Sequence, residues 1–230
     1  MDPRLRQAEP RVIIFSVDVG QENDPAALVV GERIGNPPAR YELGHLERFE
    51  LGTRYHATVD RIAQLVEHPE VALAHRFVVV DATGPGRVVM ELFEARLFKT
   101  GERRSGLLEL VGITSTDGDV VTPAKRGFPW GQYNVPKRDV VTALSVVLQG
   151  GRMAVAKGSP AAVVWQQEMQ KFQRKIGRRT VSYEAEKAAE HDDLVMANAN
   201  LIWYGEWMLG TVSLRRSARA PAQARLDLKV

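Results

Sequence analysis

Two short apolar runs, each closed by an aspartate and then a glycine, constrain the fold of this chain most. The runs are RVIIFSVDVG at 11–20 and RFVVVDATG at 76–84. β-branched residues bounded by turn-forming residues are typical of buried strands. Because side chains alternate along a strand, Asp18 shares a face with Ile14, and Asp81 shares one with Val79 and Phe77. We therefore predict two buried strands with a carboxylate at the carboxyl end of each.

The rest of the chain alternates between predicted strands and helices. Two strand-like segments, 25–34 and 39–51, follow the first run with turn-forming residues between them, which indicates an antiparallel meander. Thr53 is the expected N-cap of the first helix. The patterns predict helices at 53–70, 86–98, 138–151, 159–177 and 183–207, and further strands at 107–115 and 152–156. This order predicts an α/β fold, a mixed sheet with helices on both faces.

The last predicted helix carries an aspartate on its apolar side. Helical spacing in YEAEKAAEHDDLVMANANLIWYGEW at 183–207 gathers one stripe. Its members are Ala185, Ala188, Ala189, Asp192, Val195, Met196, Ala199, Ile202 and Trp203. An unpaired buried carboxylate costs several kcal/mol, so Asp192 needs a cation, hydrogen-bond donors or a proton. The alternative is that Asp192 caps the helix or forms a solvated pair with Asp193.

Three carboxylates converge if the two Asp-terminated strands are neighbours and this helix faces their ends. In open α/β sheets, sites gather at the carboxyl ends of strands. Like charges that close cannot all stay ionised unless a cation lies among them. Oxygen ligands select Mg²⁺ or Mn²⁺, and two such ions about 4 Å apart support in-line phosphodiester cleavage. The chain has no Cys, which excludes a thiolate nucleophile and cysteine-ligated zinc.

Several segments together resemble a known family. These are FSVDVG, VVVDATGPG, VPKRDVVTALSVVLQGGRMAV, WQQEMQKF and HDDLVMA. They resemble the nuclease domain of the large terminase subunit of tailed bacteriophages, which belongs to the RNase H-like nucleases, over roughly residues 12–209. The resemblance implies an RNase H-like nuclease domain at 1–210, followed by a basic tail at 211–230. It also implies an endonuclease that cuts double-stranded viral DNA concatemers, largely without sequence preference, when genome packaging begins and ends.

The resemblance assigns roles to individual residues. Asp18, Asp81 and Asp192 match the metal ligands of the family, and Asp193 is a fourth candidate that binds directly or through water. Asp192 is expected to be the stronger ligand of the two, because it lies in the middle of the apolar stripe. His191 is expected either to contact the metal ligands without binding the metal itself or to be structural. The implied cofactors are Mg²⁺ or Mn²⁺, two ions in all.

Partners and location follow from the same resemblance. Whole large terminases carry an ATPase motor, but this chain has no G-x-x-x-x-G-K-[ST] loop, so we expect no ATP-driven translocation from it. The implied partners are double-stranded DNA, the terminase ATPase motor domain, the portal and the small terminase subunit. The implied location is the host cell cytoplasm, with transient binding at the procapsid portal. No segment approaches the roughly 18 apolar residues of a membrane span, so no membrane partner is expected.

Two basic segments are candidate DNA contacts in this chain of net charge +3. The segment 123–139 mixes cations with aromatic residues and glycine, as a loop that reaches over DNA does. The candidates are Lys125, Arg126, Trp130, Lys137 and Arg138 there, and Lys171, Arg174, Lys175, Arg178 and Arg179 in the segment 171–179. Such contacts predict sequence-independent, salt-sensitive binding. The alternatives are a solvated charged face and an aromatic loop folded onto its own core.

Three other functions stay open on the sequence. A junction resolvase or a transposase-like nuclease shares the fold, and cleavage of four-way junctions would separate them. DVG and DATGPG also resemble the two phosphate loops of actin-like and sugar-kinase ATPases, although those chains normally need two such domains. A non-catalytic DNA-binding or docking module of a packaging motor would have no use for a full set of buried carboxylates.

Overall fold

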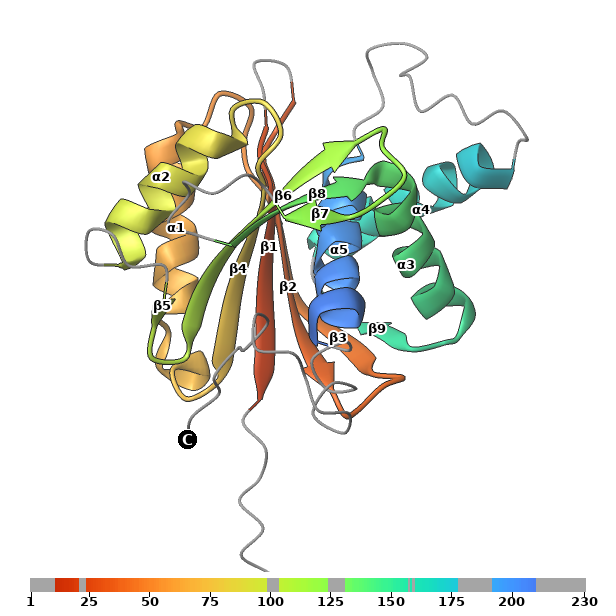
Figure 1. The fold of residues 1–230 in the computed structure, drawn as a ribbon, viewed down its shortest axis with the longest axis horizontal. Coiled ribbons are helices and arrows are strands. Elements are labelled where there is room, and N and C mark those ends of the chain that lie inside the picture. Colours follow the sequence, from red (N-terminus) through yellow and green to blue (C-terminus); the bar gives the residue numbers. More distant parts are fainter. Residues whose placement is uncertain are drawn as a thin grey trace, which may run out of the picture.

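The computed structural model describes residues 11–20, 24–98, 104–123, 131–156, 158, 160–177 and 192–209. Its centre is a nine-stranded mixed sheet in the order β7-β8-β6-β4-β1-β2-β3-β9, with β5 paired to β6 (Figure 1). The strands are β1 Val12–Asp18, β2 Ala27–Ile34, β3 Arg40–Arg48, β4 His75–Asp81, β5 Arg104–Ser105, β6 Leu108–Thr116, β7 Thr122–Pro123, β8 Gly131–Pro136 and β9 Met153–Val155.

The two Asp-terminated runs form neighbouring strands in the middle of this sheet. β1 pairs with β4 in parallel, and Val17 lies opposite Val80 at the end of the ladder. On its other side β1 begins the expected antiparallel meander with β2 and β3. β4, β6 and β8 are parallel to one another. Both the meander and the buried strands are therefore as predicted.

Helices cover both faces of the sheet, as expected (Figure 1). They are α1 Tyr55–Val66, α2 Gly86–Leu97, α3 Lys137–Gln149, α4 Pro160–Gly177 and α5 Asp193–Tyr204, with a 3-10 turn at Pro69–Val71 and a π-helical turn at Gly205–Leu209. The sheet separates two apolar clusters, one under α1 and α2 and the other under α3, α4 and α5. No helix among the described residues is long and apolar enough to cross a membrane.

The helix α5 is buried along its whole length, from Asp193 to Tyr204. It packs on β1 and β2, and glycine at position 31 of β2 makes room for it. A Cβ atom at Gly31 would lie 3.1 Å from Cδ1 of Leu201. Close packing on the central strands places the start of the helix beside the carboxyl end of β1.

Two expectations about helix starts are wrong. Thr53 does not cap α1, because the helix begins after Arg54 and the Thr53 hydroxyl donates instead to the carbonyl of Glu50 at 2.6 Å. Asp192 does not lie within the last helix, because α5 begins at Asp193 and Asp192 takes the N-cap position with φ −125° and ψ 22°. The preceding residues of the expected helix, and the expected tail at 211–230, lie outside the described residues.

Candidate active site

Asp18 and Asp81 meet at the carboxyl end of the central strands. They are the last residues of β1 and β4, which are neighbours in parallel register. Burial raises the pKa of Asp18 well above its usual value, and the negative charges of Asp81, Asp193 and Asp192 raise it further, in that order. Burial also raises the pKa of Asp81. The structure thus brings together the four carboxylates that the sequence singles out.

Asp192 and Asp193 come to this site from the start of α5. Asp193 is buried with 8% of its surface exposed, whereas Asp192 is only half-buried. The expectation that Asp192 lies in the middle of a buried stripe is therefore wrong, and Asp193 holds the buried position. The position of the helix start accounts for the difference, because Asp193 is the first residue of α5 and Asp192 is its N-cap.

Lys137 is a cation beside the carboxylates. It is the first residue of α3, directly after β8. Its positive charge lowers the pKa of both Asp18 and Asp81, against the larger effect of burial. The sequence suggested Lys137 only as a DNA contact, because nothing in the spacing of residues shows that α3 starts next to β1 and β4. The structure makes it part of the acidic site.

A tight turn after β4 holds Asp81 in place. The Thr83 amide donates to Oδ1 of Asp81 at 2.9 Å, and the Thr83 hydroxyl accepts from the Ser115 amide at 3.1 Å. The side chain and the backbone amide of Thr83 both lower the pKa of Asp81, against the larger effect of burial. The turn leaves no room for a side chain at Gly86, where a Cβ atom would lie 1.9 Å from the carbonyl oxygen of Asp81.

Behind Asp193 lies an ion network that we did not predict. Arg48 at the end of β3 pairs with Glu168 of α4, and its guanidinium also lies 3.5 Å from Oδ2 of Asp193. Glu168 in turn accepts hydrogen bonds from the amides of Leu194 and Val195 at 3.1 and 3.2 Å. Burial raises the pKa of Glu168 to about 7, although the charge of Arg48 and the Val195 amide act against it.

The donor set at the site fits a hard divalent cation. Its donors are carboxylate oxygens, and the negative charges of Asp81, Asp193 and Asp192 raise the pKa of Asp18, which is the situation that a divalent cation relieves. Within the described part of the chain, no three His, Cys, Asp or Glu side chains already converge as metal ligands do. The charges that a cation would balance are nevertheless gathered at this end of the sheet.

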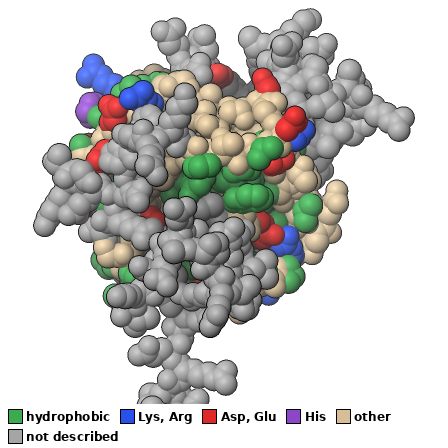
Figure 2. All heavy atoms as spheres, viewed as in Figure 1, with side chains coloured by type: hydrophobic (Ala, Val, Ile, Leu, Met, Phe, Trp, Pro, Cys, Tyr) green, Lys and Arg blue, Asp and Glu red, His purple; other side chains and the backbone are tan. Residues whose placement is uncertain are grey.

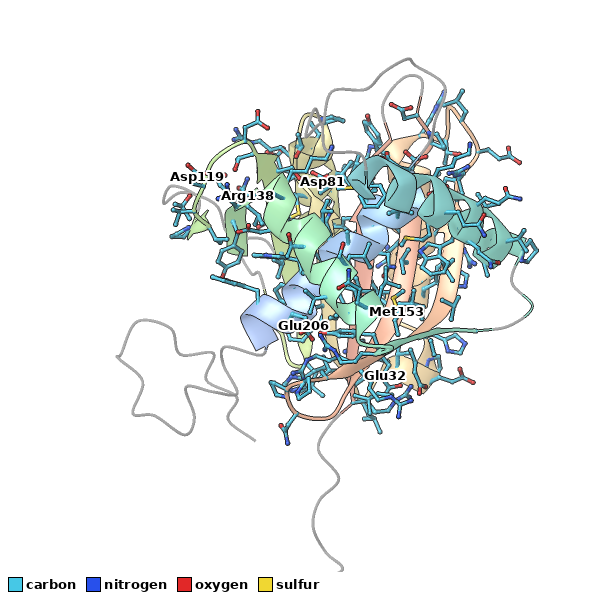
Figure 3. The ribbon with its side chains drawn as sticks, turned by 90° about the vertical axis from the view of Figure 1, so that its right-hand side faces the viewer. Glu32, Asp81, Asp119, Arg138, Met153 and Glu206 are labelled. Atoms are coloured by element: carbon cyan, nitrogen blue, oxygen red, sulfur yellow. The ribbon has the colours of Figure 1, made fainter. Side chains whose placement is uncertain are left out.

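The predicted DNA contacts are only partly within the described residues. Arg138 is exposed, but it pairs with Asp119 at 2.7 Å and donates to the Asp119 carbonyl at 3.0 Å; both residues are labelled in Figure 3. Lys171 is exposed on α4. Lys125, Arg126, Trp130, Arg178, Arg179 and His191 lie outside the described residues, as do the side chains of Arg174 and Lys175. On the face in Figure 2, the coloured Lys and Arg side chains lie beside Asp and Glu.

The fold is similar to those of several solved nucleases. The large terminase nuclease from thermophilic phage G20c matches with a TM-score of 0.50 and 17% identity, over 86% of this chain and 83% of that chain. A human cytomegalovirus terminase nuclease domain soaked with Mn matches with a TM-score of 0.47 and 13% identity, over 86% and 85%. The yeast mitochondrial Holliday junction resolvase matches with a TM-score of 0.46 and 12% identity, over 89% and 82%.

No protein-family model and no curated protein matches the sequence. The likeness to the phage terminase nuclease nevertheless confirms the predicted fold class, an RNase H-like mixed sheet with helices on both faces. At 17% identity the likeness concerns the fold, and the chemistry has to be argued from the residues of the site.

Proposed function

We propose that this chain is a divalent-metal-dependent endonuclease that cuts double-stranded DNA by phosphodiester hydrolysis. The observation that carries the proposal is the gathering of Asp18, Asp81, Asp192 and Asp193 at one end of the sheet, where burial and mutual repulsion raise the pKa of Asp18. A merely structural set of turn-forming aspartates would be solvated and would not repel one another in this way. A divalent cation bound at this end of the sheet would balance that repulsion.

Asp18, Asp81 and Asp193 are the residues that would hold Mg²⁺ or Mn²⁺, two ions in all, with Asp192 adding charge from the N-cap position. When bound, such ions act as Lewis acids, which activate water and stabilise the leaving oxygen of the phosphodiester. The backbone turn at Thr83 orients Asp81, and Arg48 orients Asp193. The positive charge of Lys137 partly offsets the negative charges of Asp18 and Asp81. The same side chain offers a cation to the phosphate backbone of DNA.

The biological role that we propose is cutting of concatemeric viral DNA at the initiation and completion of genome packaging. It is supported by the sequence motifs and by the fold shared with a phage terminase nuclease. In this role residues 1–210 form the nuclease domain and 211–230 a basic tail. The partners are DNA, the terminase ATPase motor, the portal and the small subunit, in the host cell cytoplasm and transiently at the procapsid portal. Cutting is expected to be largely independent of sequence.

Cleavage of supercoiled plasmid tests the proposed activity. Nicked and linear products are expected with Mn²⁺ or Mg²⁺, and none are expected with EDTA or with Ca²⁺ alone. Asp18→Asn is expected to fold and to lose cutting, whereas Asp60→Asn, on the exposed side of α1, keeps it. Absence of cleavage by folded wild type with either metal would contradict the proposal. Preferential cutting of a four-way junction over linear duplex would instead make the chain a resolvase.

A further inference from the structure

We propose that Glu168 and Arg48 are positioning residues that hold the start of α5, and with it Asp193, in the orientation that metal binding requires. This inference rests on the proposed nuclease function. Neither residue is one of the four aspartates that form the acidic site. Both act through Asp193 and through the backbone that carries it.

The first turn of α5 is capped by a different helix. The first amides of any helix lack partners within it, and a side chain at the N-cap normally accepts from one of them. The N-cap residue of α5 is Asp192, yet its side chain makes no capping hydrogen bond. Oε2 of Glu168, from α4, accepts from the Leu194 and Val195 amides instead. Glu168 thereby caps α5, so the Asp192 carboxylate is not used as a cap and can contribute its charge to the acidic site.

Arg48 joins this cap to Asp193. The two oxygens of Glu168 divide the task, since Oε1 pairs with Arg48 while Oε2 accepts from the helix. The same guanidinium group lies 3.5 Å from Oδ2 of Asp193. Only 6% of Glu168 is exposed, so these contacts are shielded from water. A shielded, charged network of this kind fixes geometry, because each partner has few other arrangements that satisfy it.

Loss of Glu168 would release three groups at once. The amides of Leu194 and Val195 would lose their acceptor, and Arg48 would lose its main counter-ion. The first turn of α5 would then loosen or recruit Asp192 as its cap, and either change moves carboxylates away from the site. Partners that orient metal ligands typically contribute roughly 10–100-fold to metal affinity. We expect an effect of that size.

The test is calorimetric titration of the full chain with Mn²⁺, well below the melting temperature. Glu168→Ala is expected to weaken Mn²⁺ binding roughly 10–100-fold. Glu168→Gln, whose amide oxygen can still accept from the helix, is expected to fold and to lose less affinity. Cleavage by Glu168→Gln should recover at high Mn²⁺, with the KM for DNA unchanged.

Glu206→Gln is the matched control. Glu206 pairs with Arg152 at 2.9 and 3.0 Å beyond the other end of α5, far from Asp81 in Figure 3. This substitution should lower the melting temperature and leave Mn²⁺ affinity as in the wild type. If both Glu168 variants bound Mn²⁺ like the wild type, the positioning role would be overturned while the nuclease proposal stood. If the wild type bound no Mn²⁺, the nuclease proposal itself would fail.

Discussion

Asp192 and Asp193 are adjacent in the chain but lie on opposite sides of a structural boundary, the start of α5. Asp193 is the first helical residue and is buried, while Asp192 is the half-buried N-cap. The charge of Asp193 raises the pKa of Asp18 more than the charge of Asp192 does. Asp193 is thus the closer electrostatic neighbour of the carboxylate at the centre of the site.

This difference predicts unequal effects of substitution. Asp193→Asn should abolish detectable plasmid cleavage, because it removes a buried ligand charge. Asp192→Asn should leave residual cleavage, roughly 10–100-fold below wild type, as for a group that acts through water or through its charge. The measurement is the initial rate of nicking at saturating Mn²⁺, with folding checked by circular dichroism. Complete loss in Asp192→Asn together with activity in Asp193→Asn would reverse the assignment.

The raised pKa of Asp18 predicts how stability depends on pH in the absence of metal. Between the unfolded pKa near 3.8 and the raised folded pKa, the folded state binds more protons than the unfolded state. Stability from this group is therefore lost as pH rises through that window. Glu168, whose pKa rises from 4.5 to about 7, acts in the same direction.

Asp18→Asn should consequently stabilise the metal-free protein at pH 8 more than at pH 5. A gain of about 1 kcal/mol would appear as roughly 2–4 °C in melting temperature for a chain of this size. The measurement is thermal unfolding in EDTA at both pH values. Added Mn²⁺ should stabilise the wild type and not the variant. An equal or lower melting temperature for Asp18→Asn at pH 8 would show that ionised Asp18 does not destabilise the metal-free protein.

Lys137 competes with the cations for the same carboxylates. Removal of its charge in Lys137→Met should tighten Mn²⁺ binding about fivefold, which corresponds to ~1 kcal/mol of screened repulsion. The KM for DNA should rise, because a cation is lost from the phosphate path. Arg138→Met is the neighbouring control, since Arg138 is exposed and pairs with Asp119, and it should leave Mn²⁺ affinity unchanged. Weaker Mn²⁺ binding by Lys137→Met would contradict this role.

The same sequence test that singled out Asp192 would have found Glu168. Glu168 lies on an apolar stripe of its helix with Trp165, Met169 and Phe172, and burial of Met169 and Phe172 confirms the stripe. A charged residue at such a position needs a partner. The sequence of α4 could not show that the partners of Glu168 are Arg48 and the start of α5. These partners lie 120 and 26 residues away along the chain.

Six strands, β1 to β4, β6 and β9, could be predicted because their signal is local, whereas β5, β7, β8 and the start of α5 were not predicted. The pattern of 183–207 is helical on both sides of Asp192, so spacing alone runs the helix through it. The first helical amides instead find an acceptor in Glu168, which lies elsewhere in the chain. Tertiary contacts of this kind decide helix ends, which are the least predictable part of an element.

The turn after β4 provides a further prediction, about geometry rather than charge. Gly86→Ala should be strongly destabilising, because its Cβ would lie 1.9 Å from the Asp81 carbonyl oxygen and backbone would have to move. We expect a loss of roughly 2–4 kcal/mol, in the range of severe strain. Gly44→Ala is the control, since a Cβ there meets nothing within 4 Å. Urea unfolding of both variants gives the comparison.

The same substitution should weaken metal binding, because the backbone movement that makes room for the Cβ atom displaces Asp81. The folded fraction of Gly86→Ala should therefore bind Mn²⁺ more weakly than the wild type. Wild-type affinity in that variant would mean that the turn does not set the position of Asp81.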